Sequence, residues 1–155
     1  MLDDYVKLQG LDEKLLGSGI VAFALVTRNF EKTMMRFGTS CGEFAILWCL
    51  SNVKEEINLS QVKRNTFLYS GANITKVTEK LVQKGFINRR ENPVSRREKL
   101  VKITPAGNKF ISKVMSEIRK MYGSILKSLT VTSKEKCLKD LNIILRNLIE
   151  MAGME

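Results

Sequence analysis

One stretch of the chain, residues 70–105, constrains the fold more than any other. A helix-like segment with Ser70 as its N-cap ends at Gly85, a residue suited to the left-handed position that follows a helix. Two strand-like segments, 87–91 and 98–103, follow directly and flank the loop NPVSRR. A capped helix that leads straight into a two-stranded hairpin predicts the recognition helix and the wing of a winged helix-turn-helix.

The segments that precede this stretch are predicted to be helical. Apolar residues spaced by three and four indicate a long helix over residues 11–37. Ser40 and Glu43 have the spacing of a capping box at the start of a second helix. Ser60 is expected to cap a short third helix over residues 61–66. Together with the recognition helix, these two short helices complete the expected core.

Two further long helices are predicted at the C-terminal end. One begins at Thr104-Pro105, with threonine as its cap and proline at the first helical position, and the last begins at Thr132. The last helix carries an apolar stripe, formed by Leu138, Leu141, Leu145 and Leu148. The short middle of the chain cannot cover this stripe as well as the apolar sides of the other long helices. We therefore expect the ends of the chain to form a homodimer interface.

The predicted fold class is mostly α, with a winged helix-turn-helix core and long N- and C-terminal helices that form a dimerisation region. The expected domains are an N-terminal dimerisation helix at residues 1–38, a winged helix-turn-helix DNA-binding lobe at 39–104 and C-terminal dimerisation helices at 105–155. Two-fold symmetry would place two recognition helices on successive major-groove faces of a palindromic duplex.

Positive charge is concentrated in the middle of the chain. The formal net charge is +10, and residues 61–110 carry twelve basic and three acidic side chains, whereas residues 1–60 carry six basic and eight acidic ones. A field localised in this way favours a polyanion as the partner. The basic segment lacks the large apolar face of a helix that lies on a membrane, so nucleic acid is favoured over lipid.

The residues expected to contact double-stranded DNA lie on the recognition helix and the wing. Small polar groups on the helix fit the floor of a major groove, and arginine suits a narrow minor groove. On the helix the candidates are Ser70, Ala72, Asn73, Thr75, Lys76 and Lys80. On the wing they are Arg89, Arg90, Arg96, Arg97 and Lys99, which we expect to meet only Glu91 and Glu98 as local acidic partners.

Catalysis, metal binding and membrane insertion are not expected. The sequence has no histidine, and it lacks a phosphate-binding glycine loop, a G-x-S-x-G motif and a cluster of metal ligands, so no enzyme activity, cofactor or metal is predicted. Cys41, Cys49 and Cys137 are expected to be buried, inert core thiols. Charged residues interrupt every apolar run before it reaches bilayer length, and the N-terminus is acidic. A cytoplasmic protein without a membrane partner is expected.

Residues 39–107 resemble the MarR family of bacterial transcriptional regulators. The segment SGANITKVTEKLVQKGFI resembles the family's recognition helix and its exit into the wing. The segment RRENPVSRREKLVKITPAG resembles the wing signature, in which basic residues precede a loop, Asp-x-Arg, and a strand that ends in Leu-Thr and a glycine. Arg97 matches the wing-tip arginine, Ile103-Thr104 matches Leu-Thr, and Gly107 matches the glycine.

The sequence departs from that signature at one position. Ser95 stands where the family usually has an aspartate, which braces the wing by pairing with an arginine at the position of Arg89. The resemblance therefore implies a wing that is looser or is held in a different way.

The resemblance also implies a mode of action. Members of the family bind a pseudo-palindromic operator as homodimers, usually as repressors and sometimes as activators. Many release DNA when a small molecule enters a cleft between the dimer helices and the DNA-binding lobe. Met34, Trp48 and Tyr122 are the candidates here for lining such a ligand pocket, although each also fits ordinary core packing. A small-molecule effector is thus a further partner that the resemblance implies.

One alternative remains within the same fold. A winged helix can also bind RNA or dock onto another protein. The basic segment offers few exposed aromatic residues for stacking unpaired bases, which favours duplex DNA.

Overall fold

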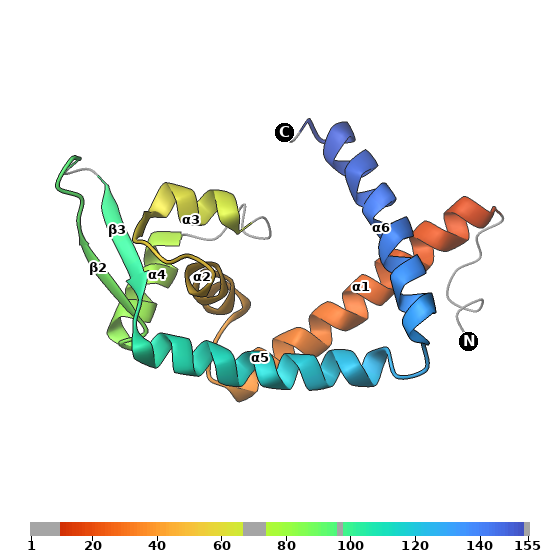
Figure 1. Cartoon of the computed structure of the whole chain (residues 1–155), viewed down its shortest axis with the longest axis horizontal. Coiled ribbons are helices and arrows are strands. Elements are labelled where there is room, and N and C mark those ends of the chain that lie inside the picture. The colour runs from red at the N-terminus through yellow and green to blue at the C-terminus, as the bar shows by residue number, and fades with distance from the viewer. Residues whose placement is uncertain (1–9, 67–73, 96–97, 154–155) are drawn as a thin grey trace. The chain divides into compact units, whose positions relative to one another are not determined.

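A computed structural model describes residues 10–66, 74–95 and 98–153 of the chain (Figure 1). Two compact units make up the chain, Met1–Ile118 and Arg119–Glu155, and each is treated by itself. The elements in chain order are α1 (Leu11–Arg36), α2 (Cys41–Ser51), β1 (Ile57–Asn58), α3 (Leu59–Asn65), α4 (Ile74–Gln83), β2 (Ile87–Glu91), β3 (Lys99–Ile103), α5 (Pro105–Ile125) and α6 (Val131–Met151). This order confirms the predicted mostly α fold with a winged helix-turn-helix core.

The capping box predicted at the start of α2 is confirmed. The Glu43 amide donates to Ser40 Oγ at 3.2 Å, and the Ser40 amide donates to Glu43 Oε2 at 2.8 Å. Without these bonds, both backbone amides would lack a hydrogen-bond acceptor inside the helix. The helix that follows is apolar on nearly all sides, as expected of a helix at the centre of a lobe.

Two of the predicted helix starts were wrong. Helix α3 is capped by Asn58 rather than Ser60, because Asn58 and Gln61 exchange two backbone-to-side-chain hydrogen bonds of 2.8 Å. Helix α6 begins after Thr130 rather than at Thr132, because Thr130 Oγ1 accepts from the Ser133 amide at 3.2 Å. In both cases a side chain two residues upstream completes the cap first.

The wing is the outer part of a three-stranded antiparallel sheet in the order β1-β3-β2. Strands β2 and β3 pair over five residues, from Ile87 opposite Ile103 to Glu91 opposite Lys99. Strand β1 contributes only two pairs, Ile57 with Val101 and Asn58 with Leu100. The backbone ladder therefore holds the hairpin together far better than it holds the hairpin to β1.

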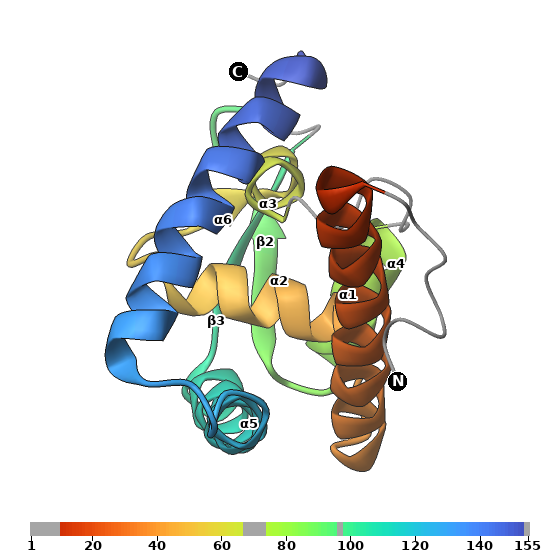
Figure 2. The same ribbon diagram turned by 90° about the vertical axis from the view of Figure 1, so that its right-hand side faces the viewer.

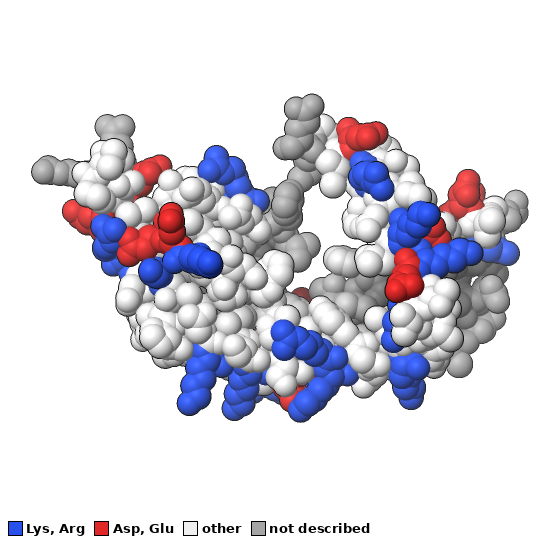
Figure 3. Space-filling view, in the orientation of Figure 1, with Lys and Arg blue, Asp and Glu red and all other residues white. Residues whose placement is uncertain are grey.

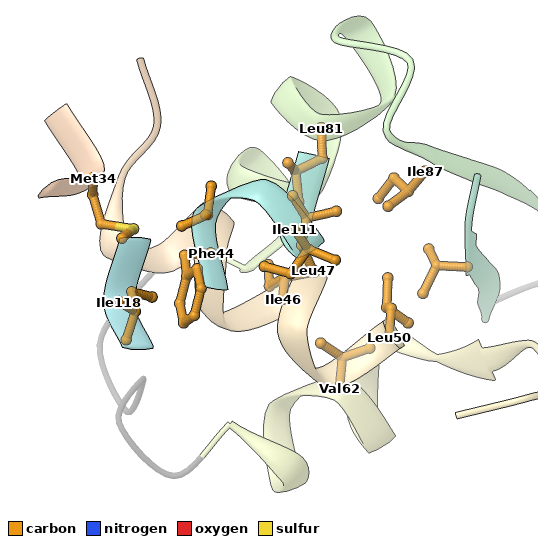
Figure 4. Packing of buried hydrophobic residues seen from close by; sticks show 12 residues of the cluster. Met34, Phe44, Ile46, Leu47, Leu50, Val62, Leu81, Ile87, Ile111 and Ile118 are labelled. Carbon is orange, nitrogen blue, oxygen red and sulfur yellow. The ribbon is translucent and has the colours of Figure 1, made fainter. Parts of the chain in front are cut away.

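The hydrophobic core of the first unit is built around α2. Figure 4 shows the α2 residues Phe44, Ile46, Leu47 and Leu50 among side chains from the other elements of the lobe. Figure 2 shows α2 crossing this unit with α3 on one side and the first part of α5 on the other. The partners from other elements are Met34, Val62, Leu81, Ile87, Val101, Ile111, Val114 and Ile118.

The two helical ends differ from this lobe. Helix α6 has no buried residue, and its leucine stripe is about half exposed throughout. The first half of α1 likewise exposes large apolar side chains, namely Leu11, Leu15, Leu16, Ile20 and Phe23. Such apolar faces are larger than a monomer commonly leaves in water. None of the helices in the described part of the chain has the length and apolar character needed to cross a membrane.

Candidate nucleic-acid interface

Helix α4 has one face in the core and one in solvent. Leu81 and Thr78 are fully buried, and Thr78 satisfies its hydroxyl by donating to the Ile74 carbonyl at 2.7 Å. Among the predicted DNA contacts, Thr75, Lys76 and Lys80 lie on the exposed side. The remaining predicted contacts of this helix, Ser70, Ala72 and Asn73, lie outside the described residues, as do Arg96 and Arg97 of the wing.

The C-terminal end of α4 is tied to the corner between α1 and α2. Lys84 Nζ donates to Glu43 Oε1 at 2.8 Å and to the Gly38 carbonyl at 3.0 Å. Glu43 is only 4% exposed, and its other oxygen accepts from Thr39 Oγ1 and the Ser40 amide. The cap of α2 is thus also the anchor of the recognition helix. No pattern of neighbouring residues in the sequence indicated this pair.

These contacts determine the charge state of the carboxylate. Burial alone would raise the pKa of Glu43. The hydrogen bond from Lys84, those from Ser40 and Thr39, and the positive charge of Lys84 outweigh burial, so the pKa is lowered below its ordinary value. Glu43 is therefore ionised at neutral pH although it is buried.

The same end of α4 is also joined to the start of α5. Gly85 has a φ of 71°, which confirms the predicted left-handed position after the helix. Thr104 Oγ1 donates to the Gly85 carbonyl at 2.8 Å and accepts from the Gly107 amide at 3.0 Å. A Cβ on Gly107 would lie 2.2 Å from the Phe86 carbonyl oxygen. The glycine of the wing signature is thus required for this close approach.

The wing cations have more acidic partners than expected. The prediction named only the local partners Glu91 and Glu98; Glu56, which precedes β1, and Glu79 of α4 also reach the wing. Arg90 binds Glu56 Oε2 through Nε at 2.8 Å and through Nη2 as well. The Lys99 ammonium lies 2.6 Å from Glu91. Figure 3 accordingly shows acidic and basic side chains intermixed over the wing strands.

The ion pairs of Arg90 with Glu56 and of Lys99 with Glu91 lower the pKa of the acidic groups that take part in them. The hydrogen bond and charge of Arg90 lower the pKa of Glu56, and those of Lys99 lower the pKa of Glu91. The bond with Glu56 raises the pKa of Arg90 in turn. Glu56, Glu91 and Arg90 are therefore charged at neutral pH.

Arg89 has a partner other than the one that the wing signature implies. With serine at position 95, Arg89 Nη1 instead lies 3.5 Å from Glu79 Oε1 on α4. Arg89 is opposite the buried Val101 in the sheet, so its side chain leaves the strand on the side of the core and of α4. The pair links the wing to the recognition helix at its exposed edge.

The residues predicted to line a ligand pocket differ in how far their side chains are exposed. Met34 is 1% exposed within the hydrophobic core, whereas Trp48 on α2 is 48% exposed. Tyr122 belongs to the second unit and is 44% exposed. The pocket stays a prediction, and Trp48 and Tyr122 are the members whose side chains a solute reaches.

The expectation that all three cysteines are buried in the core is wrong for Cys137, which is exposed. Burial raises the pKa of Cys49 and of the half-buried Cys41, so both stay thiols at neutral pH, whereas Cys137 is exposed. All three are free, and the described residues hold no group of three acidic, cysteine or histidine side chains placed to bind a metal ion.

A helix-turn-helix of α3 and α4, followed by a hairpin and set on the apolar helix α2, defines a winged helix-turn-helix protein. Residues 40–99 match the model of the MarR family. The match spans the lobe from α2 to the start of β3, and this part of the chain is similar to the MarR family.

Solved structures with the same fold cover nearly the whole chain. A MarR-family transcriptional regulator from Rhodococcus sp. RHA1 superposes with a TM-score of 0.73 at 18% identity, over 88% of this chain and 96% of that one. CouR from Rhodococcus jostii RHA1, bound to p-coumaroyl-CoA, superposes with a TM-score of 0.71 at 18% identity, over 88% of this chain and 95% of CouR. MepR from S. aureus, in complex with DNA, superposes with a TM-score of 0.70 at 15% identity, over 82% of this chain and 96% of MepR. A comparison with curated proteins found no match.

Proposed function

We propose that the protein is a sequence-specific, double-stranded DNA-binding regulator that acts as a homodimer on a pseudo-palindromic operator. The observation that carries the proposal is the exposed polar side of α4 next to a basic hairpin on one lobe. In this proposal Thr75, Lys76 and Lys80 of α4, with the predicted residues Ser70, Ala72 and Asn73, enter the major groove. Arg96 and Arg97 act at the wing tip. The structure of MepR with DNA, which has the same fold, supports DNA as the partner.

The homodimer is supported by the apolar faces at both ends of the chain. The leucine stripe of α6 and the exposed side of α1 each present more apolar surface than a monomer commonly leaves in water. Two copies related by a two-fold axis would bury these faces and present two α4 helices to one duplex. We propose that the dimer acts as a repressor and that a small ligand releases it from DNA. The CouR structure, which holds p-coumaroyl-CoA, supports a small molecule as the effector.

The test is selection of bound fragments from a pool of random duplex DNA, followed by footprinting of the selected sequence. The expected result is a protected pseudo-palindrome with half-sites about one helical turn apart. Binding should weaken steeply with salt, because each phosphate contact contributes about −0.9 to the slope of log affinity against log salt.

Two outcomes would contradict the proposal. Salt-sensitive binding without any preferred sequence would reduce α4 and the wing to a non-specific anion surface. Stronger competition by single-stranded RNA than by duplex DNA would favour an RNA-binding winged helix.

A further inference from the structure

The hairpin of the wing is attached to the rest of the lobe by few backbone bonds. Strand β1, which joins it to the helix-turn-helix, pairs with β3 at Ile57 and Asn58 only. In addition, position 95 of the wing loop holds a serine, which has no charge with which to pair a wing arginine. Other contacts must therefore hold the wing in place.

Two polar contacts on one face of the sheet cross this weak junction. Arg90 of β2 lies in register with Leu100 of β3 and Asn58 of β1, and this row points away from the buried row that contains Val101. From this face Arg90 reaches across β3 to Glu56, which precedes β1, with two N–H groups on one carboxylate oxygen.

The second contact centres on Glu98, at the end of the wing loop. Glu98 Oε2 accepts from Asn58 Nδ2 and from Asn92 Nδ2, both at 3.2 Å. The Glu98 carbonyl accepts from the Asn92 amide at 3.2 Å. Asn58 is also the N-cap of α3, so one carboxylate connects the wing loop to the first turn of the helix-turn-helix.

We propose that Glu98 and the Glu56–Arg90 pair are positioning residues that fasten the wing to the helix-turn-helix, and that Arg90 serves this purpose instead of contacting DNA. The inference rests on the proposed DNA-binding function. It assigns to an acidic residue beside the wing tip a favourable effect on DNA binding, although its charge by itself repels phosphate.

The charge effect and the positioning effect have opposite signs, which makes them separable. Glu98→Ala removes one negative charge and both side-chain bonds to asparagine. Glu98→Gln removes the same charge and keeps an acceptor oxygen. Glu91→Ala is the matched control, because Glu91 pairs with Lys99 of the same hairpin and does not join it to β1.

The experiment measures the ratio of affinities for a selected duplex and a random duplex at fixed salt. Loss of a hydrogen-bonded charged group should lower this ratio about fivefold in Glu98→Ala, with most of it recovered in Glu98→Gln and no decrease in Glu91→Ala. Equal ratios in Glu98→Ala and Glu91→Ala would overturn the inference. A wild-type ratio near one would instead overturn the proposed function.

Arg90 has a test of its own. If it contacts phosphate, Arg90→Ala should reduce the salt slope by about 0.9, and Glu56→Ala should leave the affinity ratio unchanged. As a positioning pair, Arg90→Ala and Glu56→Ala should lower the ratio to the same extent, and the double variant should lower it no further. A reduced salt slope in Arg90→Ala alone would contradict this part of the inference.

A measurement without DNA keeps the inference testable in the free protein. Amide hydrogen exchange of the wing loop should be faster in Glu98→Ala than in Glu91→Ala, since the first variant releases Asn92 from β1. Equal exchange in both variants would show that Glu98 does not hold the wing.

Discussion

The helix-turn-helix lobe and the helical ends of the chain use their apolar residues in opposite ways. In the lobe, α2 buries seven of its eleven residues, and every element around it contributes to one core. In the second unit, α6 carries a stripe of four leucines and buries none of its residues. The lobe is thus held together within one chain, whereas α6 leaves its apolar stripe exposed, and we propose that a second chain covers it. The predictions below separate these two kinds of stability.

The largest effect is expected at the closest contact in the lobe. Gly107→Ala places a methyl group against the Phe86 carbonyl, where no side-chain movement relieves the clash. We expect a loss of about 3 kcal/mol or more in the free energy of unfolding, measured by urea denaturation. Gly123→Ala is the control, because nothing lies within 4 Å of a Cβ there. It should stabilise α5 by up to about 1 kcal/mol. A Gly107→Ala variant as stable as the wild type would show that α5 can shift.

The next effect concerns the helical ends. Leu145→Asp places a charge in the apolar stripe of α6, which we propose to be buried between two chains. The dimer dissociation constant should rise about a hundredfold or more, as measured by sedimentation equilibrium, because an unpaired carboxylate is poorly tolerated in an apolar contact.

The matched control for that prediction is Asn147→Asp, which adds the same charge to an exposed polar position of the same helix. It should leave the dimer intact. Equal dissociation of both variants, or a wild-type chain that is monomeric at every concentration, would place the dimer interface elsewhere.

A smaller effect is expected from Lys84→Met, which leaves the Glu43 carboxylate buried without its cation. The expected loss at neutral pH is about 2 kcal/mol, below that of a fully buried pair because the Lys84 side chain is 36% exposed. Lys80→Met, which removes the same charge from the exposed side of α4, should cost little.

The loss of stability in Lys84→Met should depend on pH, because it comes from the charged Glu43 carboxylate. The pKa of Glu43 is lowered on folding, so its contribution is complete above the unfolded value of about 4.3 and is lost as pH falls through the lower folded value. The difference in stability between wild type and Lys84→Met should therefore be constant near neutral pH and shrink below about pH 4. A difference that grows on acidification would contradict the assigned pair.

The smallest effects compare one helix cap in each region. Ser40→Ala and Thr130→Ala each remove a side-chain acceptor at a helix start, at an expected cost of about 1 kcal/mol. Because Ser40 lies in the lobe, its variant should lower the melting temperature equally at all protein concentrations. The Thr130→Ala variant should act through α6, with a larger shift at low concentration, where fewer dimers form. The same concentration dependence for both variants would mean that the lobe and the ends unfold together.

The amino-acid sequence by itself determined the features that depend on neighbouring residues. The cap of α2 joins Ser40 and Glu43, three residues apart, and Gly85 ends α4 through its own backbone conformation. The two hairpin strands were predicted from the strand-like segments on either side of a loop of turn residues. These interactions form wherever the local sequence allows them, so a pattern of a few residues is enough to predict them.

Only the tertiary structure decided which charges meet. Lys84 lies 41 residues from Glu43, Arg90 lies 34 from Glu56, and Glu98 lies 40 from Asn58. Each of these pairs depends on which strand lies beside which and on which face a side chain leaves it. Many acidic residues at other distances in the chain would satisfy the same cations. For this reason the sequence indicated a basic wing, and the structure showed that Glu56, Glu79 and Glu91 hold three of its cations.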